Sequence, residues 1–186
     1  MARRLFIAVD IDEATREQVG RISTDVRRAI EAQAKASWVR PDRMHLTLHF
    51  FGSADAAIEG RVRGGLAQAI SEDPFDLSFH GLGFFPERGS PRVLWLGVRD
   101  GLAELRRVHK DLERACGVSP AHEGPFTPHL TLARFSDRVP RTGIAKIADI
   151  PASAGPSRID RVTLYESRFS GAGPTYVPLA KALLQT

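Results

Sequence analysis

The tetrapeptide His-Leu-Thr-Leu occurs twice in this chain, beginning at His45 and again at His129. Each copy places an imidazole two residues before a hydroxyl, which belongs to Thr47 in the first copy and to Thr131 in the second. On a β-strand, residues i and i+2 point to the same face. The repeat therefore predicts two similar strands, each with a polar His/Thr face and an apolar leucine face.

Two such strands would line one cleft with two imidazoles and two hydroxyls if they faced each other. A neutral imidazole can take a proton from water, and a protonated imidazole can give a proton to a leaving oxygen. Threonine hydroxyls can donate hydrogen bonds to an oxyanion that forms between them. This combination suits displacement at phosphorus, where negative charge spreads onto the non-bridging oxygens.

Each copy is followed by a residue that could assist this chemistry. Arg134, five residues after His129, could bind phosphate oxygens, but strict alternation puts it on the opposite face of the strand. It reaches the cleft only if the strand ends, twists or bulges near Ala133. The corresponding residue of the first copy is Phe50. Phe50 or its neighbour Phe51 could stack on a base at the cleft rim, and core packing is an equally good interpretation of both.

The apolar spacing predicts the elements that must position these residues. Strands are expected at 5–9, 37–39, 46–51, 75–79, 92–98, 130–135, 159–168 and 176–179. Helices are expected at 12–36, 55–71 and 102–116, with a short one at 143–148 inside a connecting segment, 136–155. One His-Thr strand falls in each half of the chain. This order predicts an α+β fold of two similar lobes across a groove, with mostly antiparallel strand pairs.

Composition narrows the class of protein further. A chain of 186 residues with 42% hydrophobic and 26% charged residues is typical of one soluble domain or two joined lobes. No apolar run approaches 18 residues, so no membrane span is expected. The single cysteine, Cys116, allows no internal disulfide, and a cytoplasmic location is the default expectation. The net charge of +4 is compatible with a nucleic-acid substrate, although genomic base composition is the simpler explanation for its arginines.

The remaining histidines carry no comparable pattern. His49 lies two residues beyond the first motif threonine and is expected at an exposed edge of its strand. His45 and His49 have a spacing that suits zinc on a helix, but on a strand their rings lie about 13 Å apart. We therefore expect no metal. His80, His109 and His122 have no partner pattern and are assigned no chemistry.

Several further segments accompany the two motifs in a recognisable arrangement. These segments are 4–9, 84–86, 91–98, 128–134 and 164–167, with Tyr176 near the end of the chain. With them, nearly the whole chain resembles the two-histidine phosphoesterases, which are defined by paired His-x-Thr-x motifs. Within that group it looks most like the RNA 2′,3′-cyclic phosphodiesterases, formerly called 2′-5′ RNA ligases.

The resemblance implies a bilobal α+β fold with pseudo-twofold symmetry. Two mainly antiparallel sheets would surround a central cleft, with helices on the outside, and residues 1–186 would form a single domain of two intertwined lobes. The resemblance implies no metal and no cofactor. The expected partner is RNA or a nucleotide with a 2′,3′-cyclic phosphate end, and we expect a monomer with no obligate protein partner.

The resemblance also implies an activity and a role for each motif residue. A terminal 2′,3′-cyclic phosphate would be hydrolysed to a 2′-phosphate. His129 would be the general base on water, and His45 the general acid for the departing 3′-oxygen. Thr47, Thr131 and Arg134 would hold the phosphate oxygens.

Two other functions stay open at this point. The same cleft could bind a terminal phosphate or RNA without turnover, which would need Arg134 and the threonines but not two imidazoles. The presence of both histidines favours catalysis. Family members can also join RNA ends through a 2′-5′ bond in the reverse direction, so a 2′-5′ RNA ligase or 2′-5′ phosphodiesterase is the further alternative.

Overall fold

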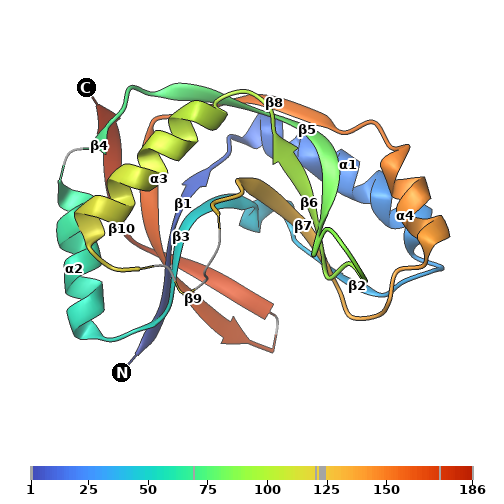
Figure 1. Cartoon of the computed structure of the whole chain (residues 1–186), viewed down its shortest axis with the longest axis horizontal. Helices are drawn as coiled ribbons and strands as arrows, with labels where there is room; N and C mark the ends of the chain where they lie inside the picture. Colours follow the sequence, from blue (N-terminus) through green and yellow to red (C-terminus); the bar gives the residue numbers. More distant parts are fainter. Residues whose placement is uncertain (1, 69, 120, 122–124, 172, 186) are drawn as a thin grey trace.

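The computed structural model describes residues 2–68, 70–119, 121, 125–171 and 173–185. In this part of the chain the strands form two five-stranded sheets that curl toward each other (Figure 1). The first sheet has the order β3 (His45–Ala54), β1 (Arg3–Asp10), β9 (Arg161–Ser170), β10 (Gly173–Gln185) and β4 (Ile70–Ser71). The second has the order β2 (Ala36–Trp38), β7 (His129–Phe135), β6 (Val93–Val98), β5 (Phe75–Phe85) and β8 (Ser153–Ile159). The β10–β4 pair is parallel and the other pairs are antiparallel.

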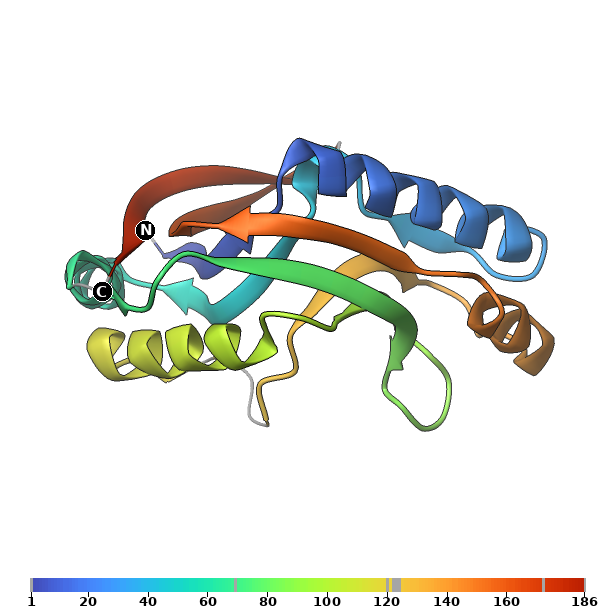
Figure 2. The ribbon, with the colours of Figure 1, turned by 90° about the horizontal axis from the view of Figure 1, so that it is seen from above.

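The helices lie on the outside of the two sheets (Figure 2). They are α1 (Glu13–Ile30), α2 (Ala56–Ala67), α3 (Leu102–Cys116) and α4 (Arg141–Ala148). A short 3-10 turn, η1 (Pro41–Arg43), leads into β3. The helix α1 follows β1 of the first sheet but packs on β8 of the second sheet and on α4. The helix α3 follows β6 of the second sheet but packs on α2 and on β3 and β4 of the first. Each of these two helices thus follows a strand of one sheet and covers the other sheet. In the described part of the chain, no helix is long and apolar enough to cross a membrane.

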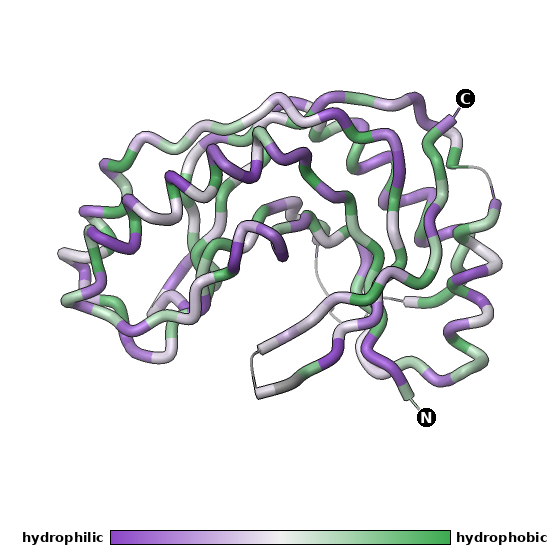
Figure 3. Tube along the Cα trace, turned by 180° about the vertical axis from the view of Figure 1, so that it is seen from behind, coloured by the Kyte–Doolittle hydropathy of each residue, from purple (hydrophilic) through white to green (hydrophobic). Residues whose placement is uncertain are grey.

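The two long helices form because each has one apolar stripe, and α1 also has a side-chain cap at its start. In α1 the Asp12 carboxylate accepts a hydrogen bond from the Thr15 backbone N–H at 2.8 Å, which satisfies one of the free donors at the helix start. Its buried residues recur at helical spacing, and they include Val19, Ile22, Val26 and Ile30. The stripe of α3 is Leu105, Val108, Leu112 and Cys116. This alternation of hydrophobic and hydrophilic residues is visible along both helices in Figure 3.

The leucines of the two motifs anchor the cleft strands in the core. Leu46 and Leu48 of β3, like Leu130 and Leu132 of β7, are buried. They lie within one continuous core that the two lobes share. Because a one-residue shift would expose these leucines, their burial fixes which face of each strand carries the histidine and the threonine.

Both motif strands carry a β-bulge immediately after the motif threonine. In β3, Thr47 pairs with Ala8 and His49 with Ile7, so that Leu48 is an additional residue. A bulge restarts the alternation of side chains. Leu48 and His49 consequently both point to the core, and Phe50 returns to the face that carries Thr47.

The same irregularity occurs in β7. Thr131 pairs with Trp95 and Ala133 with Leu94, so that Leu132 is the additional residue. Leu132 and Ala133 are both buried, and Arg134 is exposed on the face that carries Thr131.

Several boundaries differ from those expected from the sequence. The helix α1 ends at Ile30, where a helix to residue 36 was expected, and β5 continues to Phe85, beyond the expected end at 79. The strand β8 begins at Ser153, inside the segment predicted to be a connection. The helix α2 ends at Ala67, and Ile70–Ser71, predicted to be helical, pairs with β10. The last strand spans Gly173–Gln185 instead of four residues. Prolines at 174 and 178 interrupt the pattern of this strand, and its register with β9 shifts beyond the second one, which is why the sequence underestimates its length.

Candidate active site

The two motif histidines begin two strands that lie side by side between the lobes. His45 is the first residue of β3 and His129 the first of β7, and these strands contact each other at the centre of the molecule (Figure 1). The His45 Nδ1 atom lies 2.9 Å from the carbonyl oxygen of Arg43. The His129 Nδ1 atom lies 2.8 Å from the carbonyl oxygen of Thr127. A carbonyl only accepts, so Nδ1 donates in both rings and Nε2 is the atom that exchanges a proton.

The two rings are close enough for their charges to interact. Burial lowers the pKa of His45, and a positive charge on His129 lowers it further, while the carbonyl of Arg43 and the carboxylate of Asp10 raise it. Burial also lowers the pKa of His129, and the guanidinium of Arg134 acts in the same direction, against the carbonyl of Thr127. The net effect in both rings is a pKa below the ordinary value of 6.5, so each imidazole can exchange a proton near neutral pH.

The charges beside the two histidines are opposite in sign. Asp10 is the cross-strand partner of His45. Its carboxylate accepts hydrogen bonds from the Tyr165 hydroxyl, at 2.8 Å to each oxygen, and from Thr163 Oγ1 at 3.4 Å. The charged group that acts on the pKa of His129 is instead the cation of Arg134. The anion favours a proton on His45, and the cation favours its absence on His129.

Aromatic rings surround His45. Phe6 stacks on the imidazole with a centroid distance of 4.8 Å, and Tyr176 meets it edge-on at 4.8 Å. Tyr165 lies at 6.4 Å. These rings limit the orientation of His45 and exclude water from one side of it.

A second pair of aromatic rings borders His129. Phe85 meets its ring edge-on at a centroid distance of 4.9 Å, and Trp95 lies at 6.1 Å. The Trp95 ring occupies the space above Gly83, where an added Cβ would lie 2.2 Å from the indole. Sequence reasoning missed these aromatic neighbours of both histidines. All of them belong to the segments that carry the family resemblance, but their spacing along the chain does not indicate a common site.

The polar residues predicted to hold a phosphate lie on the faces of β3 and β7 that carry the motif histidines. Thr47 and Thr131 lie two residues after the histidines and are partly exposed. The bulge in β7 places Arg134 on the same face as Thr131. Burial raises the pKa of Tyr176, and Arg134 and Arg43 lower it. Since Tyr176 belongs to the opposite sheet, the charge of Arg134 acts across the space between the two sheets, and Arg43 adds a cation that sequence reasoning did not select.

The structure contradicts the prediction for His49 and, of the two interpretations left open for Phe51, it shows core packing. Phe51 cannot stack on a base, because it is 7% exposed, belongs to the core and stacks on His49 at 4.6 Å. His49 is 2% exposed instead of lying at an exposed edge. The bulge at Leu48 turns His49 inward, where its Nε2 donates to the Val118 carbonyl at 3.1 Å. Phe50, by contrast, is partly exposed on the cleft face, with the Arg4 guanidinium over its ring.

The other described histidines make contacts outside the faces that carry the motif histidines and threonines. His80 hydrogen-bonds Ser153, while His109 bonds the Leu48 carbonyl and stacks on Phe126 at 4.1 Å. His122 lies outside the described residues. Within the described ranges, no group of three or more His, Cys, Asp or Glu residues is arranged to hold a metal ion.

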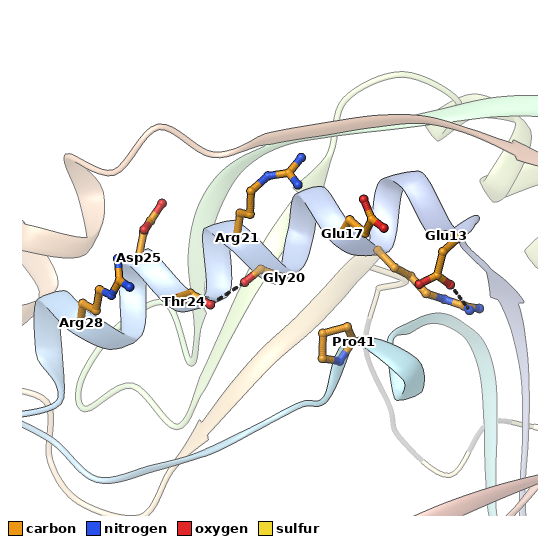
Figure 4. A pocket seen from close by; sticks show the side chains of 9 residues that line it. Glu13, Glu17, Gly20, Arg21, Thr24, Asp25, Arg28 and Pro41 are labelled. Carbon is orange, nitrogen blue, oxygen red and sulfur yellow. Dashed lines mark hydrogen bonds and ion pairs between the residues drawn. The ribbon is translucent and has the colours of Figure 1, made fainter.

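A surface pocket along α1 is separate from the motif strands (Figure 4). Charged residues of both signs line it, with Pro41 at one side, and it includes no residue of either motif. Interspersed charges of this kind are typical of a solvated helix face. We therefore assign no chemistry to this pocket.

Two opposed His-Thr strands in a bilobal α+β fold define a two-histidine phosphoesterase. A family model described as the 2′-5′ RNA ligase superfamily matches residues 11–168. The chain therefore belongs to the 2′-5′ RNA ligase superfamily.

Similar proteins extend over nearly its full length. A curated relative from Methanothermobacter thermautotrophicus, named RNA 2′,3′-cyclic phosphodiesterase, is 32% identical and covers 96% of this chain and 97% of its own. One of the same name from Archaeoglobus fulgidus is 31% identical over 95% and 97%. Among solved structures, E. coli LigT complexed with 3′-AMP has a TM-score of 0.78 at 26% identity, covering 100% of both chains. Thermus thermophilus TT0787 has a TM-score of 0.73 at 29% identity over 97% of both.

Proposed function

We propose that this protein is an RNA 2′,3′-cyclic phosphodiesterase that hydrolyses a terminal 2′,3′-cyclic phosphate to a 2′-phosphate. The observation that carries the proposal is the pair of interacting imidazoles, His45 and His129, which both direct Nε2 away from a carbonyl-bound Nδ1. The names of relatives that match nearly the whole chain support the same activity.

The reaction needs two proton transfers at one phosphorus atom. Nε2 of His129 takes a proton from a water molecule, whose oxygen attacks the phosphorus. The bond between phosphorus and the 3′-oxygen breaks, and Nε2 of His45 gives its proton to that oxygen. The products are a free 3′-hydroxyl and a 2′-phosphate. Exchange with solvent returns both imidazoles to their starting states.

The charges around the cleft favour this division of roles over the reverse one. Asp10 beside His45 favours the protonated acid, and Arg134 near His129 favours the neutral base. The hydroxyls of Thr47 and Thr131 and the guanidinium of Arg134 donate to the non-bridging oxygens, on which charge accumulates in the transition state. No metal or cofactor takes part in this scheme.

The cleft is assembled from residues of one chain, which supports a monomer as the active form. The free Cys116 is buried, as suits a protein of the reducing cytoplasm, where we place this enzyme. The substrate class is RNA or a nucleotide with a cyclic phosphate end. Joining of RNA ends through a 2′-5′ bond would use the same residues in the reverse direction.

The test is incubation of the purified protein with 2′,3′-cyclic CMP and with a short RNA that ends in a cyclic phosphate, in the presence of EDTA. Chromatography that separates 2′-CMP from 3′-CMP should show the 2′-phosphate alone. Formation of 3′-CMP would reverse the assigned leaving group. Binding without turnover would contradict the proposal and favour a non-catalytic RNA-end module.

A further inference from the structure

Phe169 is an exposed aromatic residue on the β9–β10 hairpin, which projects beyond the rest of its sheet (Figure 1). Its side chain is 66% exposed, and among the described residues only Leu183 is another large hydrophobic residue of comparable exposure, at 60%. A single exposed hydrophobic residue is ordinary. Phe169 differs from Leu183 because the guanidinium of Arg4, on the neighbouring strand β1, lies over its ring.

The guanidinium of Arg4 lies between two aromatic rings. Its central carbon is 5.2 Å from the ring centroid of Phe169 and 5.4 Å from that of Phe50. The three residues come from β9, β1 and β3, which are neighbours in the first sheet. They therefore form a row of planar groups across the strands, which we call the Phe50–Arg4–Phe169 row.

This row lies on the face of the sheet that carries His45. Arg4 is two residues before Phe6, whose ring stacks on His45, and residues two apart on a strand share a face. Phe50 is the cross-strand partner of Phe6. On β9, Phe169 follows Tyr165 by four residues, and Tyr165 is the other partner of Phe6.

The opposite face of the same strands is occupied by ion pairs. Arg3 contacts Glu59 of α2 and Glu166, and Glu166 also pairs with Arg168. The described carboxylates form no ion pair with Arg4, so its charge remains available to an anion. The row thus combines two aromatic rings with the cation of Arg4. Arg4 lies about 7 Å along β1 from Phe6, whose ring contacts His45.

These groups match the chemistry of single-stranded RNA. Bases stack on aromatic rings and on arginine guanidinium planes without regard to sequence, and the cation attracts the phosphate backbone. A cyclic phosphate held between His45 and His129 is the last group of an RNA chain, so the preceding nucleotide must leave the cleft along one wall. The row continues the wall formed by Phe6 and Tyr165.

We propose that the Phe50–Arg4–Phe169 row is a stacking platform for the nucleotide directly 5′ of the one that bears the cyclic phosphate. This inference rests on the proposed function and extends it. The enzyme then processes RNA ends faster than cyclic mononucleotides, with little dependence on base identity. Phe169 contributes to activity on RNA but not to activity on the mononucleotide.

The test compares kcat/KM for 2′,3′-cyclic CMP with kcat/KM for a tetranucleotide that ends in the same cyclic nucleotide. Phe169→Ala should lower the value for the RNA roughly 5- to 100-fold, the usual range for loss of one stacked base. It should change the value for the mononucleotide less than twofold. Leu183→Ala is the matched control and should change neither, and Phe169→Trp should retain the preference for RNA.

An abasic tetranucleotide that lacks the base next to the terminal nucleotide identifies the stacking partner. The kcat/KM of the wild-type protein for this abasic RNA should be as low as that of Phe169→Ala for the intact RNA. The kcat/KM of Phe169→Ala should be the same for the abasic and the intact RNA. Equal effects of Phe169→Ala on RNA and mononucleotide would overturn the platform.

A binding measurement separates failure of the platform from failure of the proposed function. A fluorescently labelled tetranucleotide with a 2′-phosphate end should bind Phe169→Ala more weakly than wild type, whether or not the protein turns over a cyclic phosphate. Unchanged binding would overturn the platform even if hydrolysis is observed. Weakened binding without any hydrolysis would support the platform and contradict the proposed activity.

Discussion

Phe50 and Arg134 occupy the same position in two strands that are bulged alike, five residues beyond His45 and His129 respectively. The pseudo-symmetric cleft therefore presents an aromatic ring on one side and a cation on the other. This difference, together with Asp10 beside His45, makes the two imidazoles unequal. In the proposed mechanism, one repeated motif thus provides an acid and a base.

Replacement of Arg134 by Gln should lower kcat/KM for the cyclic phosphate roughly 100- to 1,000-fold, because one charged donor to the developing oxyanion is lost. Arg134→Lys should recover part of the activity, since it keeps the charge but not the planar fork. Removal of the cation should also raise the pKa of His129 and move the acidic limb of the pH profile to higher pH. Arg114→Gln, on the exposed side of α3, is the control. A variant Arg134→Gln with normal kinetics would exclude phosphate contact.

The pH profile of kcat/KM should be bell-shaped, because one imidazole must be neutral and the other charged. The Asp10 carboxylate raises the pKa of His45. Asp10→Asn should therefore lower that pKa and move the alkaline limb to lower pH, while the acidic limb, set by His129, stays in place. Profiles measured between pH 5 and 9 check this. Movement of the acidic limb alone would reverse the roles of the two histidines.

His49 should make the stability of the fold depend on pH. Burial lowers its pKa below the ordinary value of 6.5, and the neighbouring His109 lowers it further. The unfolded chain then binds the proton more readily, so the stabilisation is present above pH 6.5 and is lost as the pH falls through the lowered pKa. Between pH 7.5 and 5.5, the free energy of unfolding in urea should fall more for wild type than for His49→Leu. Parallel losses in the two proteins would contradict this assignment.

Gly83 should be intolerant of a side chain because the Trp95 ring fills its space. An added Cβ would lie 2.2 Å from the indole, so Gly83→Ala must displace the ring that borders His129. We expect a loss of roughly 1–3 kcal/mol in stability and a lower kcat. Gly60→Ala is a matched control, since nothing lies within 4 Å of an added Cβ there, and it should not destabilise the protein. Thermal unfolding of both variants measures the change in stability, and steady-state kinetics measure the change in kcat.

The sequence predicted the two motif strands and their faces because the alternation of polar and apolar residues is local. It did not predict the bulges, since these depend on pairing with Ala8 and Trp95 from distant parts of the chain. The bulges in turn decide that His49 and Phe51 lie in the core and that Arg134 reaches the cleft face. The aromatic neighbours of the histidines were missed for the same reason. Phe6 and Tyr176 approach His45, and Phe85 approaches His129, only when the sheets form.

The most direct test of the central claim is kcat for an RNA 2′,3′-cyclic phosphate in His45→Ala, His129→Ala and the double variant, with folding verified by thermal unfolding. Each single replacement should lower kcat at least about 100-fold. The double variant should lose far less than the product of the two factors, because the two imidazoles act on the same phosphorus as one unit. A single variant that retains a tenth of the wild-type kcat, or two losses that multiply, would contradict the account.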